Sequence, residues 1–176
     1  ASTNSYFYPS VTLSALFSEI FKLPSVISYA KLRGSYASVG NDTDPYSLLN
    51  TYSLGGYWNG IPMLQNSPDL LNNGLKPAMS DTWEIGAELN FFKNRLSIDF
   101  SYYNTKTKDQ IISLQNALTS GYGSRKINSG KTENKGFELM VNATPIQLAN
   151  SFKWDIGFNF SRSRTNVLYL AEGMEE

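Results

Sequence analysis

Hydrophobic and polar residues alternate along most of this chain with a two-residue period. Apolar residues occupy every second position from Trp83 to Phe91, and again from Leu96 to Tyr102. Strand side chains point alternately to the two faces of a sheet, so the pattern predicts strands with one apolar face each. No segment shows a convincing helical period. The predicted strands are residues 11–18, 31–40, 80–92, 95–111, 133–144 and 152–167.

The third and fourth of these strands are predicted to form a hairpin about Lys93-Asn94. Asn tolerates the left-handed backbone conformation that tight hairpin turns require. Folding there brings Leu89 opposite Ile98 and places every apolar residue on one side. One register that sorts all the apolar residues in this way is how strand pairing is specified.

The last two strands are predicted to form a second hairpin, with its turn at residues 145–150. Pro145 ends the preceding run because proline cannot donate to a sheet ladder. In this register Val141 lies opposite Trp154.

The lengths of the strands and connections favour a membrane setting. The strands run for roughly 10 to 15 residues, against about 5–6 in ordinary globular proteins. The connections alternate between short turns at 93–94 and 145–150 and long segments at 41–79 and 113–132, with at most a short strand near Tyr52. Outer-membrane barrels have this asymmetry, with short periplasmic turns and longer extracellular loops.

The two faces of the predicted sheet differ in chemistry. Glu88 lies opposite Asp99, and such a like-charge pair is destabilising unless it is well solvated. The polar face therefore meets water, and we predict that it faces the lumen of a barrel: Glu84, Glu88, Asp99, Glu138, Lys153 and Asp155. The other face carries aromatic residues toward the strand ends, as a membrane-interface girdle does, and we predict lipid contact for Trp83, Leu89, Phe91, Ile98, Phe100 and Trp154. A one-sided sheet in a soluble protein would alternate in the same way.

Composition narrows the chemistry. The chain has 176 residues, no Cys, no His, and equal numbers of acidic and basic residues. Most metal sites, thiol nucleophiles and the usual general base are therefore excluded, and a neutral chain is not expected to bind nucleic acid. Glu88 and Asp99 have the residue types of a glycosidase pair, but the sequence shows neither a cleft nor a partner that would raise one pKa. We expect no cofactor, no metal, no catalytic residue and no enzymatic activity.

Several blocks of the sequence resemble the barrel of SusC-type TonB-dependent transporters. They are "YFYPSVTLSALFSEIF" (6–21), "KLRGSYASVGN" (31–41), "LKPAMSDTWEIGAELNFFKNRLSIDFSYYNTKTKDQI" (75–111), "NKGFELMVNATPI" (134–146) and "FKWDIGFNFSRSRTNVLYL" (152–170). The blocks follow the order of the family and cover most of the chain. One departure is Ala78, which stands where the family usually has Glu.

The resemblance implies a channel in the outer membrane of a Gram-negative cell that imports glycans, oligosaccharides or peptides. Such barrels have about 22 strands around a plugged lumen. TonB releases the plug, and a SusD-like surface lipoprotein covers the mouth. The polar face would then line the channel or bind the plug, and the segments at 41–79 and 113–132 would lie outside the cell.

The resemblance also implies that residues 1–176 are an internal segment of a longer chain. The sequence contains no TonB box, no plug domain and no terminal closing strand. Six or seven strands cannot close a large barrel, and open edges are not tolerated in lipid. We therefore expect an all-β fold of antiparallel strands that forms part of a large transmembrane β-barrel.

Aromatic residues in the long segments are candidate ligand contacts. Tyr46, Tyr57, Trp58 and Tyr122 could stack on sugars or touch a lid protein, or they could pack within their own loops. An alternative function from another class is a soluble carbohydrate-binding β-sandwich.

Overall fold

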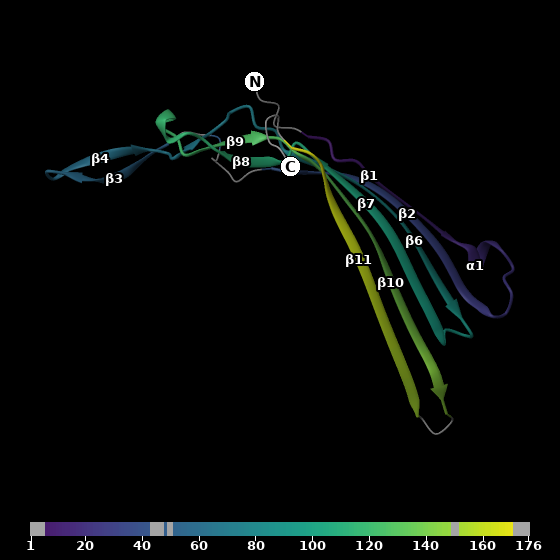
Figure 1. The fold of residues 1–176 in the computed structure, drawn as a ribbon. Helices are drawn as coiled ribbons and strands as arrows, with labels where there is room; N and C mark the ends of the chain where they lie inside the picture. The colour runs from purple at the N-terminus through teal and green to yellow at the C-terminus, as the bar shows by residue number, and fades with distance from the viewer. Residues whose placement is uncertain (1–5, 43–47, 49–50, 149–151, 171–176) are drawn as a thin grey trace. The chain divides into compact units, whose positions relative to one another are not determined.

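The computed structural model describes residues 6–42, 48, 51–148 and 152–170, and nearly all regular structure in them is strand (Figure 1). Six long strands form one sheet in the order β1-β2-β6-β7-β10-β11. Each strand lies beside its neighbour in the order in which the chain builds the sheet, so the predicted antiparallel all-β architecture is confirmed. The six strands are β1 (Ser10–Leu16), β2 (Ile27–Asn41), β6 (Ala78–Phe91), β7 (Leu96–Lys108), β10 (Lys131–Gln147) and β11 (Lys153–Tyr169).

The chain divides into two compact units. Unit 1 comprises residues 1–39, 81–106 and 133–166, and unit 2 comprises residues 40–80, 107–132 and 167–176. Unit 1 contains most of the length of the six strands. Unit 2 contains the strand ends and both of the long segments that the sequence predicts to be loops.

The β6–β7 hairpin of unit 1 forms as predicted. Lys93 and Asn94 have φ angles of 57° and 66°, the left-handed values of a primed hairpin turn, and the Arg95 amide donates to the Phe92 carbonyl at 3.3 Å. The Thr82 and Thr105 hydroxyls are 2.9 Å apart. They lie in the register that also brings Leu89 opposite Ile98, so the predicted pairing extends along the hairpin.

The second hairpin has a different register from the predicted one. β10 continues through Pro145 to Gln147, and the Leu148 amide donates to the Phe152 carbonyl at 2.9 Å. The Thr144 hydroxyl donates to Asp155, so Val141 does not lie opposite Trp154. The prediction was wrong because Pro145 was expected to end the strand. Proline is compatible with an extended backbone and removes only its own N–H, so a strand can run a short way past it.

The first strand ends earlier than expected. β1 stops at Leu16 and is followed by the four-residue helix α1 (Phe17–Ile20), so the predicted strand at 11–18 is shorter at its end. The rings of Phe17 and Phe21 stack at 5.7 Å between centroids. β1 pairs with β2 from Ser10 opposite Ala37 to Leu16 opposite Lys31.

Unit 2 has more regular structure than the sequence predicted. Residues 52–66 form a hairpin of β3 (Tyr52–Trp58) and β4 (Ile61–Asn66), and its turn residues Asn59 and Gly60 have φ angles of 47° and 78°. Asn-Gly is the strongest short-range signal for such a turn, and it is present in the sequence. A second small sheet joins β5 (Asp69–Leu70), β9 (Ser124–Asn128) and β8 (Ile111–Gln115), with a 3₁₀ turn at Leu118–Ser120.

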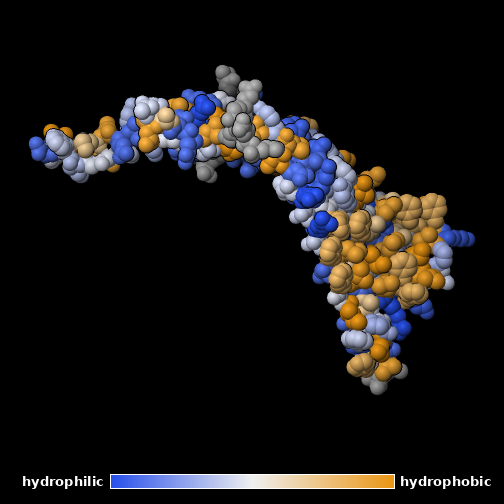
Figure 2. Space-filling view, viewed as in Figure 1, coloured by the Kyte–Doolittle hydropathy of each residue, from blue (hydrophilic) through white to orange (hydrophobic). Residues whose placement is uncertain are grey.

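The described residues contain no large, fully buried side chain. Among the described residues, the buried apolar side chains are the small ones of Ala30, Pro77 and Ala78, whereas most large apolar side chains of the described strands are exposed. Apolar side chains gather over the strands of unit 1 on the face seen in Figure 2. A patch of this kind marks a surface that meets another apolar phase or partner. None of the described helices is long and apolar enough to cross a membrane.

Candidate functional site

One face of the sheet in unit 1, here called the apolar face, presents hydrophobic side chains to the surroundings. Trp83, Phe100 and Trp154 are 38%, 41% and 50% exposed. The other three predicted lipid contacts, Leu89, Phe91 and Ile98, are half-buried. The same face carries Leu13, Leu32, Ile85, Ile156, Phe158 and Phe160, all exposed.

Aromatic rings form a row across this face. The Trp83 and Tyr102 rings lie 5.4 Å apart and join β6 to β7. The Phe137 ring on β10 lies 5.6 Å from Phe160 on β11 and 6.4 Å from Phe100 on β7. Aromatic pairs at these distances add to stability beyond the effect of burying their apolar area. They link four neighbouring strands.

The opposite face, here called the polar face, is organised by Arg33. Its guanidinium donates two hydrogen bonds of 3.0 Å to the two carboxylate oxygens of Asp99, and its Nε lies 3.7 Å from Glu84. A bidentate arginine–carboxylate pair is among the stronger polar contacts in proteins. Arg33 is on β2 and Asp99 is on β7, so the side chain spans the strand between them.

A glycine makes that span possible. A Cβ at Gly86 on β6 would lie 2.5 Å from the Arg33 Nε and 2.7 Å from its Cζ. The guanidinium therefore lies directly over the backbone of β6. A side chain at position 86 would displace it.

The sequence anticipated the carboxylates of this cluster but not their partner. Glu84, Glu88 and Asp99 lie around one cation, so the like-charge pair of Glu88 and Asp99 is compensated by Arg33 as well as by water. Arg33 occupies a polar position of an alternating run. That position, together with Gly86, is the available sequence signal.

The other predicted lumen residues, Glu138, Lys153 and Asp155, also lie on the polar face. Glu138 lines a hollow of about 330 Å³ together with Arg33, Asp99 and Asn159. Asp155 accepts hydrogen bonds from Thr144 and is paired with Lys153 at 3.0 Å. Both members of that pair are more than half exposed. The polar face thus carries ion pairs at more than one position along its strands.

The aromatic residues of unit 2 differ from one another. Tyr57 and Trp58 at the end of β3 are 73% and 70% exposed, so their rings do not pack within the hairpin. Tyr122 is half-buried, and its hydroxyl accepts a hydrogen bond of 3.1 Å from the Asn66 amide. Tyr46 lies outside the described residues.

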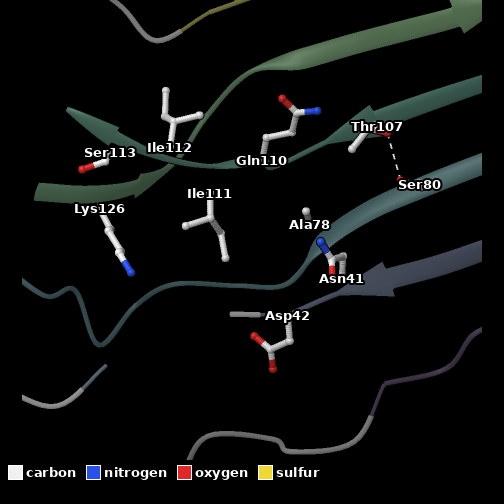
Figure 3. Close-up of a pocket in the computed structure, with 10 residues that line it drawn as sticks. All are labelled: Asn41, Asp42, Ala78, Ser80, Thr107, Gln110, Ile111, Ile112, Ser113 and Lys126. Carbon is white, nitrogen blue, oxygen red and sulfur yellow. Dashed lines mark hydrogen bonds between the residues drawn. The ribbon is translucent and has the colours of Figure 1, made fainter. Parts of the chain in front are cut away.

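Unit 2 also contains a hollow of about 500 Å³, shown in Figure 3. Its wall includes a hydrogen bond of 2.9 Å between Ser80 and Thr107, and the Gln110 amide donates to Thr132 at 3.1 Å. Polar side chains predominate around it, with two isoleucines: Asn41, Asp42, Ala78, Ser80, Thr107, Gln110, Ile111, Ile112, Ser113 and Lys126.

The described residues hold no cluster of three or more side chains that could bind a metal ion. What the sheet can do is separate two environments. Its apolar face suits hydrocarbon, whereas its polar face suits water and polar ligands.

Comparison with known proteins agrees with this arrangement. Residues 2–173 match the family model described as "TonB dependent receptor-like, beta-barrel". The chain is 31% identical over 176 residues to TonB-dependent receptor P3 of Formosa agariphila, covering 95% of this chain and 17% of that receptor. It is 30% identical over 169 residues to receptor P39 of the same bacterium, covering 94% of this chain and 16% of that receptor.

Solved structures share the fold. The structure of the RagAB peptide transporter superposes with a TM-score of 0.86 at 24% identity, covering 95% of this chain and 18% of that one. The RagAB peptide importer in its open-open state gives a TM-score of 0.82 at 23% identity, covering 98% of this chain and 19% of that one. The chain therefore spans less than a fifth of the length of these relatives.

The family match covers nearly the whole chain, and the curated relatives are named as receptors. It favours the predicted barrel over the soluble sandwich, and barrels of this family lie in the outer membrane of Gram-negative bacteria. The chain belongs to the TonB-dependent receptor β-barrel family, which confirms the predicted resemblance and location.

Proposed function

We propose that this chain forms part of the wall of a TonB-dependent, SusC-type importer of oligosaccharides or peptides. The observation that carries the proposal is the contrast between the faces of one sheet. Large apolar side chains are exposed on one face, while Arg33 joins carboxylates on the other. A barrel wall between hydrocarbon and water needs this contrast.

In this proposal the apolar face contacts lipid and the polar face lines the lumen or binds the plug. The outer strands of the described sheet, β1 and β11, pair with further strands of the same barrel. All residues of both strands are exposed except one half-buried residue of β1, which fits strands that are covered on assembly. Unpaired strand edges are costly in hydrocarbon.

The long segments at 41–79 and 113–132 are proposed to lie outside the cell. Their β3–β4 hairpin presents Tyr57 and Trp58 to the surroundings. Exposed aromatic rings are suited to stacking on sugars or to anchoring a protein interface. We assign these two residues to contact with a SusD-like lipoprotein lid or with the incoming substrate.

Uptake by cells tests the importer. Cells that carry the complete transporter with its lipoprotein should accumulate a labelled oligosaccharide or peptide from a defined mixture. A protonophore, which removes the energy that TonB transmits, should abolish accumulation. Uptake that persists without the transporter, or that is indifferent to the protonophore, would contradict the proposal.

A paired substitution tests the role of the hairpin. Tyr57→Ala with Trp58→Ala should reduce uptake or lipoprotein retention, measured by co-purification. Tyr52→Ala with Leu54→Ala is the matched control, since these side chains are 72% and 70% exposed on the same strand. Equal effects of the two pairs would remove the specific role of Tyr57 and Trp58.

A further inference from the structure

The apolar face of unit 1 changes character along its strands. Past the aromatic row, toward the end of β11 and the start of β10, the same face carries charged residues. Arg162 and Arg164 follow Phe160 on β11, and Lys135 precedes Phe137 on β10. On β7, Tyr102 is followed by Asn104 and Lys106 at the same face. The hydrophobic surface therefore ends at a line of cations on three neighbouring strands.

These residues surround a hollow. Tyr102, Lys135, Gly136, Phe137, Arg162 and Arg164 line a space of about 240 Å³. Three of the six are cations, and two are aromatic. The hollow thus combines a basic wall with an apolar floor.

The charges around the hollow do not balance. Glu133 pairs with Lys135 at 2.9 Å and lies 3.7 Å from Lys106. It also accepts a hydrogen bond of 3.1 Å from Asn104. No acidic side chain among the described residues pairs with Arg162 or Arg164. Lys106 does not line the hollow, and in the register that pairs Thr82 with Thr105 it lies opposite Asp81. The three cations that line the hollow, counted with Glu133, give a net charge of +2.

The position of the cluster matches the edge of a membrane. On the apolar face, Arg162 on β11 lies ten residues beyond Phe152, and Lys106 on β7 lies ten residues beyond Leu96. At roughly 3.4 Å per residue and a tilt of about 40°, ten residues rise about 26 Å along the membrane normal. The apolar band of an outer-membrane barrel is about 25 Å tall. The cations therefore stand at the level of the lipid headgroups, directly above the aromatic row.

We propose that this hollow binds the phosphate group of a lipid in the outer leaflet. Arg162, Arg164 and Lys135 contact the phosphate, Arg by paired N–H donors that fit its oxygens. Tyr102 and Phe137 meet the start of the acyl chains. Basic clusters next to hydrocarbon are attracted to anionic headgroups in this way. The inference rests on the proposed function, because it requires the apolar face to contact lipid.

Glu133 acts against this binding. Its carboxylate neutralises Lys135 and adds negative charge near the phosphate. The Glu133→Gln substitution keeps an oxygen that can accept the hydrogen bond from Asn104, while it removes the charge. It should therefore strengthen phosphate binding, the reverse of what arginine removal does.

Lipid titration of the complete transporter tests the site. Protein purified in neutral detergent is titrated with diphosphoryl lipid A, with the same lipid after enzymatic removal of its phosphates, and with inorganic phosphate. Retained lipid is counted by native mass spectrometry. The phosphorylated lipid should bind, and Arg162→Gln with Arg164→Gln should weaken it about tenfold, at roughly one kcal/mol or less per cation removed near an anionic surface.

Matched variants keep the test decisive. Arg125→Gln with Lys126→Gln removes the same charge from β9 in unit 2 and should leave lipid binding unchanged. Glu133→Gln should increase affinity. The proposal is overturned if the arginine double variant binds like the native protein, if both double variants lose affinity equally, or if the dephosphorylated lipid or inorganic phosphate binds as well as the phosphorylated lipid.

The uptake assay separates this site from the proposed function. If uptake is energy-dependent and the arginine double variant retains lipid normally, the lipid site is wrong and the importer stands. If uptake fails while the phosphorylated lipid binds through Arg162 and Arg164, the importer is wrong and a membrane barrel of another function stands. Folding of each variant is checked by the heat-dependent shift in gel mobility that folded barrels show.

Discussion

The two faces of the sheet in unit 1 hold neighbouring strands together by different kinds of contact. On the apolar face, neighbouring strands are linked by rings such as Trp83 with Tyr102, which need no defined partner atoms. On the polar face, strands are linked by directed contacts, of which the pair of Arg33 and Asp99 is the strongest. The effect of a substitution should therefore depend first on which face the residue occupies, and only then on the change in side-chain size. Apolar positions tolerate changes of shape, whereas polar positions depend on particular partners.

The largest expected effect comes from placing a charge on the apolar face. Ile98→Arg in the complete transporter should destabilise the barrel by about 2–3 kcal/mol, because Ile98 lies inside the apolar band and arginine there costs up to about 2–4 kcal/mol at the midplane and less toward the interfaces. Ser97→Arg is the matched control, since Ser97 precedes Ile98 on the same strand and points to the polar face. Denaturant midpoints of barrels refolded into bilayers measure both. Equal losses would mean that the two faces do not meet different solvents.

The next effect tests the close approach of side chains over glycine on the polar face. A Cβ at Gly136 would collide with the Tyr103 hydroxyl and lie 3.0 Å from the Arg162 carbonyl oxygen. Gly136→Ala should therefore cost about 1–3 kcal/mol, as overpacking does. At Gly34, the nearest atom to an added Cβ is 3.9 Å away, so Gly34→Ala should be nearly neutral. Thermal unfolding followed by gel mobility compares the two. A neutral Gly136→Ala would show that Tyr103 does not need this glycine.

The β6–β7 hairpin could be predicted from sequence because all its information is local. Alternation, the turn at Lys93-Asn94 and a single consistent register agree with one another. The β10–β11 register was wrong because it depended on where the turn falls, and Pro145 was a misleading marker. The β3–β4 hairpin was not predicted, although Asn59-Gly60 is a strong sequence signal for its turn. In that segment Pro62 and Gly55-Gly56 interrupt the alternation.

The Arg33 cluster could not be predicted, since it depends on which strands are neighbours. Arg33 and Asp99 are 66 residues apart, and the strand between them, β6, follows the long segment at 41–79. Alternation assigns each residue to a face, but it does not give the order of strands. The exposed Arg162 and Arg164 could not be assigned a role from the sequence either, because the alternation distinguishes only the apolar positions of that strand.

A smaller effect is expected when the polar face loses its central cation. Arg33→Gln removes both bonds to Asp99 and leaves Glu84, Glu88 and Asp99 without compensation. The side chains of the pair are about one third exposed, so water screens part of the loss and we expect about 1–2 kcal/mol. Adding Asp99→Asn to Arg33→Gln should recover part of that stability, because it removes one of the repelling charges. If Asp99→Asn gives no recovery in a double-mutant cycle, the two residues are not coupled.

The smallest effect is expected at the more exposed ion pair of the polar face, between Lys153 and Asp155. Lys153 and Asp155 are 3.0 Å apart, yet their side chains are 54% and 56% exposed, and exposed pairs of this kind contribute little because water and salt compete for both charges. Lys153→Gln should leave the denaturant midpoint unchanged within error, and added salt should not alter that result. The comparison with Arg33→Gln is direct, since each substitution replaces one cation by the same neutral side chain. An equal loss of stability on substitution of Lys153 and of Arg33 would show that solvent exposure and strand bridging do not distinguish the two pairs. The polar face would then be stabilised by its total charge and not by the placement of Arg33 over Gly86.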